Sequence, residues 1–210
     1  MTFDKKFKAA ISGLSHVEKD KLIFRLLRKD VDVANQLLFE LLGNGVENRR
    51  KEAQKQIENY VASSQNNRYY FTPGVLLMDM RDASGIINEH VKITKDRYGE
   101  VELQIFVLKE YLQIYNNHFK NVSPKKSYTI NIYMVAKAFK IMTLLKKLHE
   151  DFVLDFAQNL KEIGFMFGEN SALMDIAIRN GLDVNWLIQN NIPNNIAEIE
   201  KHLRQNGFLR

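Results

Sequence analysis

The 210-residue chain contains no cysteine. This absence excludes a disulfide scaffold, thiol catalysis and thiolate metal sites, and it fits a reducing compartment. Long apolar runs are missing as well, because charged or amide side chains interrupt every apolar segment before about eighteen residues, the length of a membrane span. The start of the chain has no continuous apolar stretch like that of a signal peptide. We therefore expect a cytoplasmic protein without a membrane partner.

Proline is also scarce, and its three positions, Pro73, Pro124 and Pro193, indicate where helices begin. Each lies at or close to the start of a segment whose apolar residues recur at helical spacing, where the missing N–H of proline costs least. Ser15 and Glu18 form a capping box in front of another such segment. The periodicity predicts an all-α protein, either an irregular multi-helix bundle or stacked antiparallel helix hairpins.

Two polar loops, residues 63–72 and 116–127, and a turn at residues 96–99 separate the helical segments. The remaining sequence predicts helices over residues 17–29, 31–42 or 33–42 (with Asp30 or Asp32 as the N-cap), 46–62, 73–91, 101–115, 128–148, 151–167, 172–179, 184–190 and 194–205. Segment 101–115 begins with alternating apolar residues, so a strand is the alternative there. We expect a single helical domain over residues 1–210, and an N-terminal helical subdomain over residues 1–64 is the alternative division.

The residue patterns of known catalytic and metal sites are missing. The five histidines form no H-x-x-x-H pair and no E-x-x-H motif of the di-iron kind. Glu198 and His202 lie one helical turn apart, but a solvated surface contact explains that pair better than a metal site does. Neither a G-x-S-x-G elbow nor a glycine-rich phosphate loop occurs. We expect no catalytic residue, metal or cofactor, and an enzymatic or metabolite-binding bundle remains an alternative.

The net charge of +5 arises from 30 basic and 25 acidic residues, so the surface is mixed in sign. Basic residues cluster in two segments and would suit a phosphate backbone as an alternative partner. The candidate nucleic-acid residues are Arg49, Arg50, Lys51, Lys55, Lys125 and Lys126. Glutamates interleave the first cluster, which favours an ordinary solvated helix face.

Aromatic residues are concentrated in two places. Arg68, Tyr69, Tyr70 and Phe71 lie in the first loop and have the composition of an interface hot spot. The segment from Gly164 to Gly168 encloses Phe165, Met166 and Phe167, which either fill the core or face a groove for a partner; burial statistics favour the core. The leading hypothesis is a protein-protein interaction module whose partner contacts residues 68–71.

Three segments of the chain resemble those of an uncharacterised family of small bacterial all-helical proteins. They are the opening FKAAISGLSHVEKDKLIFRLL (7–27), the stretch INEHVKITKDRYGE (87–100) and the block LLKKLHEDFVLDFAQNLKEIGFMFG (144–168). The resemblance rests on helical patterning and on the Tyr98–Gly99 pair. It implies an all-helical fold, and it assigns no activity, cofactor or site residue.

Overall fold

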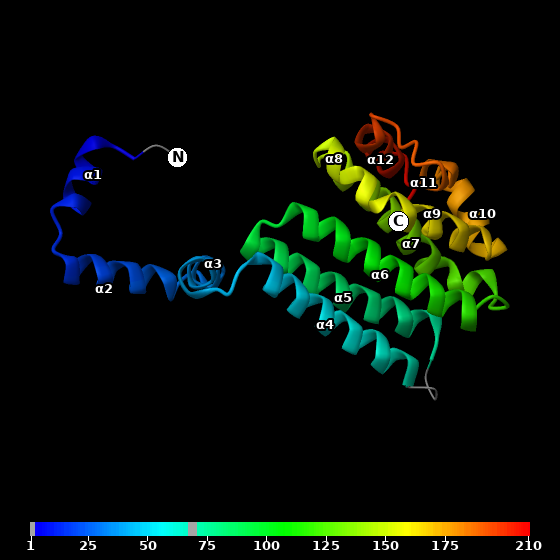
Figure 1. Cartoon of the computed structure of the whole chain (residues 1–210), viewed down its shortest axis with the longest axis horizontal. Coiled ribbons are helices and arrows are strands. Elements are labelled where there is room, and N and C mark those ends of the chain that lie inside the picture. The colour runs from blue at the N-terminus through cyan, green and yellow to red at the C-terminus, as the bar shows by residue number, and fades with distance from the viewer. Residues whose placement is uncertain (1–2, 67–70) are drawn as a thin grey trace.

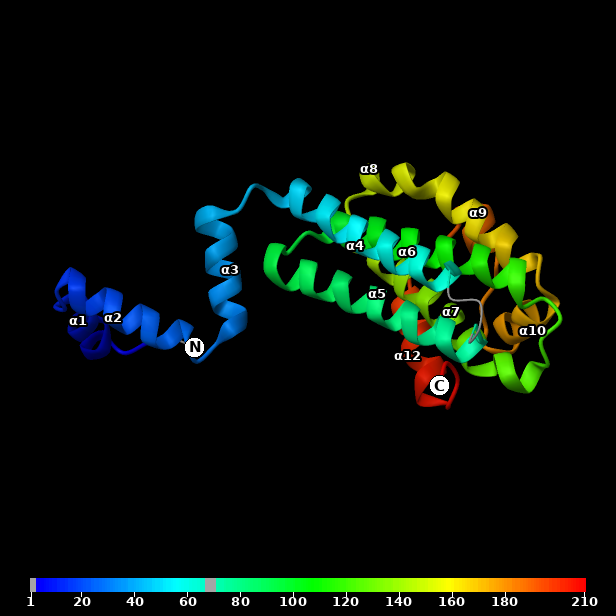
Figure 2. The ribbon, with the colours of Figure 1, turned by 90° about the horizontal axis from the view of Figure 1, so that it is seen from below.

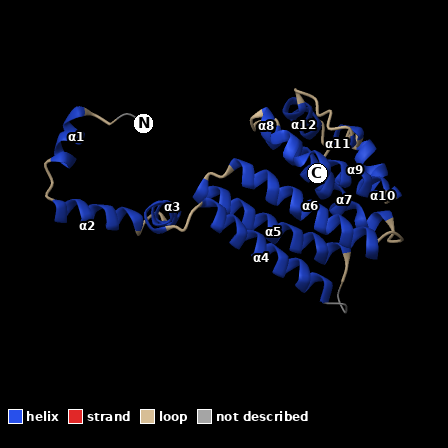
Figure 3. Ribbon diagram, viewed as in Figure 1, coloured by secondary structure: helices blue, strands red, loops and turns tan. Residues whose placement is uncertain are grey.

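The computed structural model describes residues 3–66 and 71–210, and every regular element in these two ranges is a helix (Figure 3). The all-α prediction is therefore confirmed, and segment 101–115 is helical. The helices are α1 (Lys5–Ser12), α2 (His16–Leu27), α3 (Val31–Leu42), α4 (Val46–Asn66), α5 (Pro73–Thr94), α6 (Arg97–His118), α7 (Pro124–Leu145), α8 (Glu150–Val153), the 3₁₀ turn η2 (Leu154–Phe156), α9 (Ala157–Gly168), α10 (Ser171–Arg179), α11 (Asn185–Ile188) and α12 (Ile196–Gln205).

Several helix starts follow directly from the sequence. Ser15 and Glu18 form the predicted capping box at α2, and the Thr72 side chain accepts a hydrogen bond from the Val75 amide at the start of α5. Several boundaries were wrong. The loop predicted over residues 116–127 is shorter, because α6 continues to His118 and α7 already begins at Pro124. Helix α4 continues through Asn66, four residues into the predicted loop, and Asp96 caps α6 by accepting the Gly99 amide, so residues 97–99 are helical.

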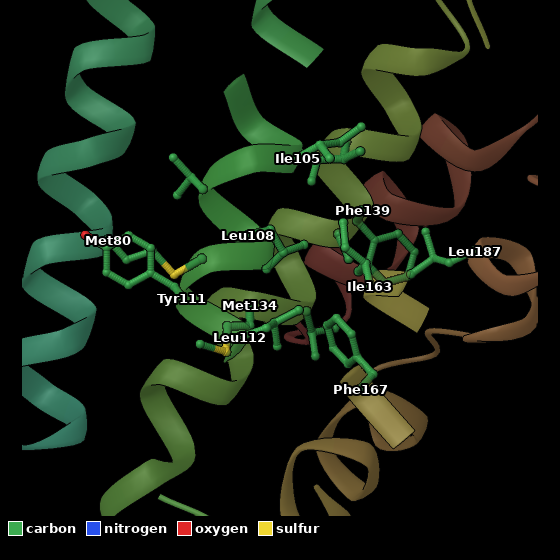
Figure 4. Packing of buried hydrophobic residues seen from close by; sticks show 14 of the residues in the cluster. Met80, Ile105, Leu108, Tyr111, Leu112, Met134, Phe139, Ile163, Phe167 and Leu187 are labelled. Carbon is green, nitrogen blue, oxygen red and sulfur yellow. The ribbon is translucent and has the colours of Figure 1, made fainter. Parts of the chain in front are cut away.

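Helices α4, α5, α6 and α7 form the central bundle, in which each helix runs antiparallel to the one before it (Figures 1 and 2). Helix α9 packs against α6, and α10 and α12 pack against α7, so the C-terminal helices cover the other side of this bundle. Large side chains such as Tyr111, Phe139 and Phe167 fill the interior between these layers (Figure 4). The core is therefore formed by side chains from the central bundle and from the C-terminal helices that cover it.

Helices α1 and α2 project away from this body (Figures 1 and 2). Neither helix contributes a buried residue, and neither does α3. Helix α3 nevertheless packs against α5: Asp32 pairs with Lys92, and the Gln36 side-chain amide donates to the Lys92 carbonyl at 2.9 Å. Helix α4 belongs to the body because it packs against α5 and α6. The change in packing thus lies near residues 43–45, and the division of the chain into subdomains remains a prediction.

Candidate interaction surfaces

We call α1 and α2 the N-terminal arm, residues 5–27 with the preceding Phe3. The arm exposes more large apolar side chains than is usual for a helix surrounded by water. Phe3, Phe7 and Ile11 recur every four residues, and the rings of Phe3 and Phe7 lie 5.4 Å apart. The exposed large apolar residues of the arm are Phe3, Phe7, Ile11, Val17, Ile23, Phe24 and Leu26. Phe3, Phe7 and Ile11 form an apolar stripe along α1, and exposed apolar side chains gathered in this way mark an interaction surface.

The same part of the chain carries its excess positive charge. Residues 1–29 contain eight lysines and arginines and three acidic residues, so they supply a charge of +5, which equals the net charge of the whole chain. Residues 30–210 are therefore neutral overall. Lys5, Lys6 and Lys8 lie on α1 beside the apolar stripe. The arm is a basic amphipathic helix pair.

A second unfilled surface lies at α9, α10 and α11. It is an open apolar groove with a volume of about 940 Å³. The residues that line this groove are Gly164, Phe165, Gly168, Glu169, Met174, Ile178, Gly181, Leu182, Asp183, Val184, Asn185 and Ile188. Phe165 and Ile178 are 52% and 61% exposed, although both are large and apolar. A groove of this size and polarity is suited to binding a ligand or a helix.

The charge of the groove is opposite to that of the arm. Glu169 and Asp183 are the charged residues among those that line it. The helices that form it, over residues 157–188, contain four acidic and two basic residues. One of the basic residues, Lys161, lies 5.9 Å from the centre of the Phe165 ring. A basic amphipathic partner would therefore meet both apolar side chains and carboxylates.

The two glycines of α9 explain why a groove forms there. A Cβ atom on Gly164 would lie 2.5 Å from Ile188 Cγ1, so this glycine lets α11 approach α9 closely. A Cβ atom on Gly168 would meet nothing within 4 Å, so the last turn of α9 is open. Of the three residues between them, Phe167 is buried, Met166 is half-buried and Phe165 lines the groove. Phe167 thus fills the core, as burial statistics favour, whereas Phe165 faces an open groove.

The predicted partner-binding residues fall mostly outside the described ranges. Arg68, Tyr69 and Tyr70 lie there, and only Phe71 can be placed. Phe71 is half-buried, and its ring centre lies 5.2 Å from that of His118 and 5.1 Å from that of Phe119. Phe71 therefore joins the start of α5 to the end of α6, which is a packing role. The assignment of residues 68–71 to a partner remains a prediction.

The predicted nucleic-acid residues do not form one surface. Arg50 contacts Asp96 at the end of the bundle where α5 meets α6, whereas Lys125 and Lys126 follow Phe119 at the opposite end. Arg49 and Lys51 pair with Glu89 and Glu47 at 3.6 and 2.8 Å. Lys55 is exposed.

Arg50 instead anchors α4 to the α5–α6 junction. Its Nε atom lies 2.7 Å from Asp96 Oδ2, its Nη1 atom lies 3.1 Å from a Glu102 oxygen, and its guanidinium lies 5.2 Å from the Tyr98 ring centre. Burial alone would raise the pKa of Asp96, but hydrogen bonds from His90 and Arg50 and from the Gly99 amide outweigh burial and lower that pKa to about 2. Asp96 is therefore a permanently ionised structural residue at neutral pH.

A buried lysine is the most unusual titratable group of the body. Lys137 on α7 donates to Ser84 Oγ on α5 at 2.7 Å, and the Tyr133 hydroxyl lies 3.1 Å from the same oxygen. Burial, together with the nearby charge of Lys140, lowers the pKa of Lys137 to about 7. Serine and lysine also form catalytic dyads. Here the Ser84 hydroxyl donates to the Met80 carbonyl at 2.7 Å, so its proton is directed at the backbone and not at the amine.

Neither a cluster of metal ligands nor a helix of membrane-spanning character occurs among the described residues. Within residues 3–66 and 71–210, no three His, Asp or Glu side chains gather in a way that would hold a metal ion. No helix in the same ranges combines the length and apolar character that crossing a membrane requires.

Sequence reasoning missed the arm and most of the groove. The spacing of Phe3, Phe7 and Ile11 and the local excess of lysine were readable, but α1 was not among the predicted helices. The groove joins residues from three helices, and only Gly164, Phe165 and Gly168 had been singled out. Comparison of the chain with protein-family models, with curated proteins and with solved structures found no match in any of the three.

Proposed function

We propose that the chain is a protein-binding module that assembles with other protein chains through its N-terminal arm. The observation that carries this proposal is the contrast between arm and body. The body fills its core with large side chains, whereas α1 and α2 bury no residue and expose an apolar stripe. An apolar stripe on a projecting helix pair gains free energy when a partner covers it.

The shape of the molecule supports a binding role as well. The body holds α3 through the Asp32–Lys92 ion pair and the Gln36 hydrogen bond, and α3 in turn presents the arm away from α4–α7. A presented amphipathic helix binds by laying its apolar face into a groove of the partner. Aromatic anchors such as Phe7 and Phe24 would carry most of the binding energy.

Capture of partners by two forms of the chain tests this function. The full chain and a form that lacks residues 1–29 are immobilised and exposed to nuclease-treated lysate of the source cells, and the retained proteins are identified and weighed against the bait. We expect a stoichiometric protein on the full chain and its loss on the shortened form. Purified partner should then bind the full chain with an affinity at least about tenfold higher than the shortened form.

A matched variant separates the apolar stripe from the charge of the arm. Phe7→Asp places a carboxylate within the stripe, whereas Ala9→Asp places the same carboxylate on the opposite face of α1. Loss of partner with Phe7→Asp and its retention with Ala9→Asp would support the proposal. Equal capture by the full and shortened chains, or capture that nuclease abolishes, would contradict it.

A further inference from the structure

We infer that the partner of the arm is a second copy of this chain, whose groove between α9, α10 and α11 receives helix α1. This inference rests on the proposed function and names the occupant of its binding surface. In the contact, Phe7 and Ile11 enter the apolar groove, and the lysines of α1 face the carboxylates of Glu169 and Asp183.

The two surfaces match in polarity and in charge. The arm offers exposed aromatic and aliphatic side chains on a short helix, and the groove offers Phe165, Met174 and Ile178 around an open volume of about 940 Å³. The arm and its flanking residues, 1–29, carry a charge of +5, while four acidic and two basic residues occupy residues 157–188. Opposite charges around an apolar centre favour association and fix the orientation of the helix.

The arm of one copy does not reach the groove of the same copy. The arm and helices α9 to α11 lie at opposite ends of the molecule in both views (Figures 1 and 2). Helix α3, which joins the arm to the body, is held against α5 through Lys92. The arm therefore meets a groove only when that groove belongs to another copy.

Exchange of arms between two copies covers both surfaces of the proposed contact, the apolar stripe of α1 and the groove. Each copy gives one arm and receives one, so a two-fold arrangement leaves neither an exposed stripe nor an open groove. The body of each copy keeps its own core, because the arm contributes no buried residue to it. The exchange is thus compatible with the fold of the separate copy.

Cysteine cross-linking tests the contact directly, since the chain has no cysteine of its own. A copy with Phe7→Cys is mixed under mild oxidation with a copy of different tag length that carries Ile178→Cys. We expect this pair to form the mixed disulfide at least about tenfold faster than a Phe7→Cys copy mixed with a Lys55→Cys copy. Ile178 and Lys55 are both exposed. Equal rates for the two pairs would overturn the inference.

Charge exchange gives a second, independent readout. Light scattering measures the mass of the natural chain, of a groove variant with Glu169→Lys and Asp183→Lys, and of an arm variant with Lys5→Glu and Lys8→Glu. We expect a mass above one copy for the natural chain and of one copy for each variant alone. A mixture of the two variants should regain the larger mass, because each supplies the charge that the other lacks. A natural chain that stays at one copy would overturn the inference.

The outcomes distinguish the inference from the proposed function. A chain that remains a single copy and yet captures a different protein through its arm would remove the second copy as partner and leave the binding function in place. A chain that neither associates with itself nor captures a protein through its arm would contradict both. Circular dichroism of each variant confirms that the helices are intact before its mass is interpreted.

Discussion

Lys137 is a buried lysine whose charged form is disfavoured in the folded protein. Its amine lies between α5 and α7 with Ser84 Oγ as its hydrogen-bond acceptor, and the lysine is 5% exposed. The pKa of Lys137 falls from 10.5 in the unfolded chain to about 7 because burial disfavours the charged form. Between these two values the unfolded chain binds the proton and the folded chain does not. The free energy of unfolding therefore rises with pH across this range.

Replacing Lys137 with methionine should stabilise the protein below pH 7. A methionine fills similar space and has no charge to bury, so we expect the free energy of unfolding at pH 6 to increase by about 2 kcal/mol. Since the natural lysine is neutral when folded at higher pH, the gain should shrink as the pH approaches 10. Denaturant titrations of both proteins at pH 6 and pH 9.5 measure the difference.

Lys126→Met on the same helix is the control, because Lys126 is exposed. Its effect on the free energy of unfolding should stay within about 0.5 kcal/mol at both pH values. A stability gain for Lys137→Met that does not change with pH would show that side-chain volume, and not the buried amine, is responsible.

At the scale of helices, two mid-helix glycines should respond to the same substitution in opposite directions. Gly164→Ala forces α9 and α11 apart, since the new methyl group would lie 2.5 Å from Ile188 Cγ1 and 3.3 Å from the Ile188 amide nitrogen. We expect a loss of about 1–2 kcal/mol in the free energy of unfolding. Gly85→Ala on α5 meets nothing within 4 Å and should stabilise by about 0.5–1 kcal/mol. Chemical denaturation of the two variants compares them, and the same sign for both would contradict the packing described for α9.

The helices themselves were largely predictable from the sequence, because caps and apolar periodicity are local. Ser15, Thr72 and Pro73 mark helix starts through groups only three residues away. One boundary that was wrong involves a side chain whose partner is distant in the chain. Asp96 binds Arg50 as well as the Gly99 amide, so a polar turn motif became the first turn of α6.

The candidate site was less predictable because it depends on which surfaces stay uncovered. Periodicity identifies the apolar face of a helix, but it does not tell whether the body covers that face. Helices α2 and α9 both have apolar faces; α9 buries Leu160 and Ile163, and α2 buries none. The groove, in turn, needs α9, α10 and α11 to be placed relative to one another. That placement depends on contacts such as Gly164 with Ile188.

At the scale of the whole molecule, the body should not depend on the arm for its stability. A form that lacks residues 1–29 keeps α3 and every residue of the buried core. At protein concentrations too low for self-association, we expect its free energy of unfolding to differ from that of the full chain by less than about 0.5 kcal/mol. Thermal and denaturant unfolding of both forms at matched dilution provide the comparison. A clearly less stable shortened form would mean that the arm packs on its own body in solution.

The order of arm and groove along the chain has a consequence during synthesis. The arm leaves the ribosome before the groove does, and at ordinary elongation rates roughly 7–30 s pass before α9, α10 and α11 follow. During this interval a nascent chain displays its apolar stripe and has no groove of its own to offer. A finished copy nearby already has one. Neighbouring ribosomes on one message would thus bring an emerging arm to a completed groove, and assembly would begin while the second copy is still being translated.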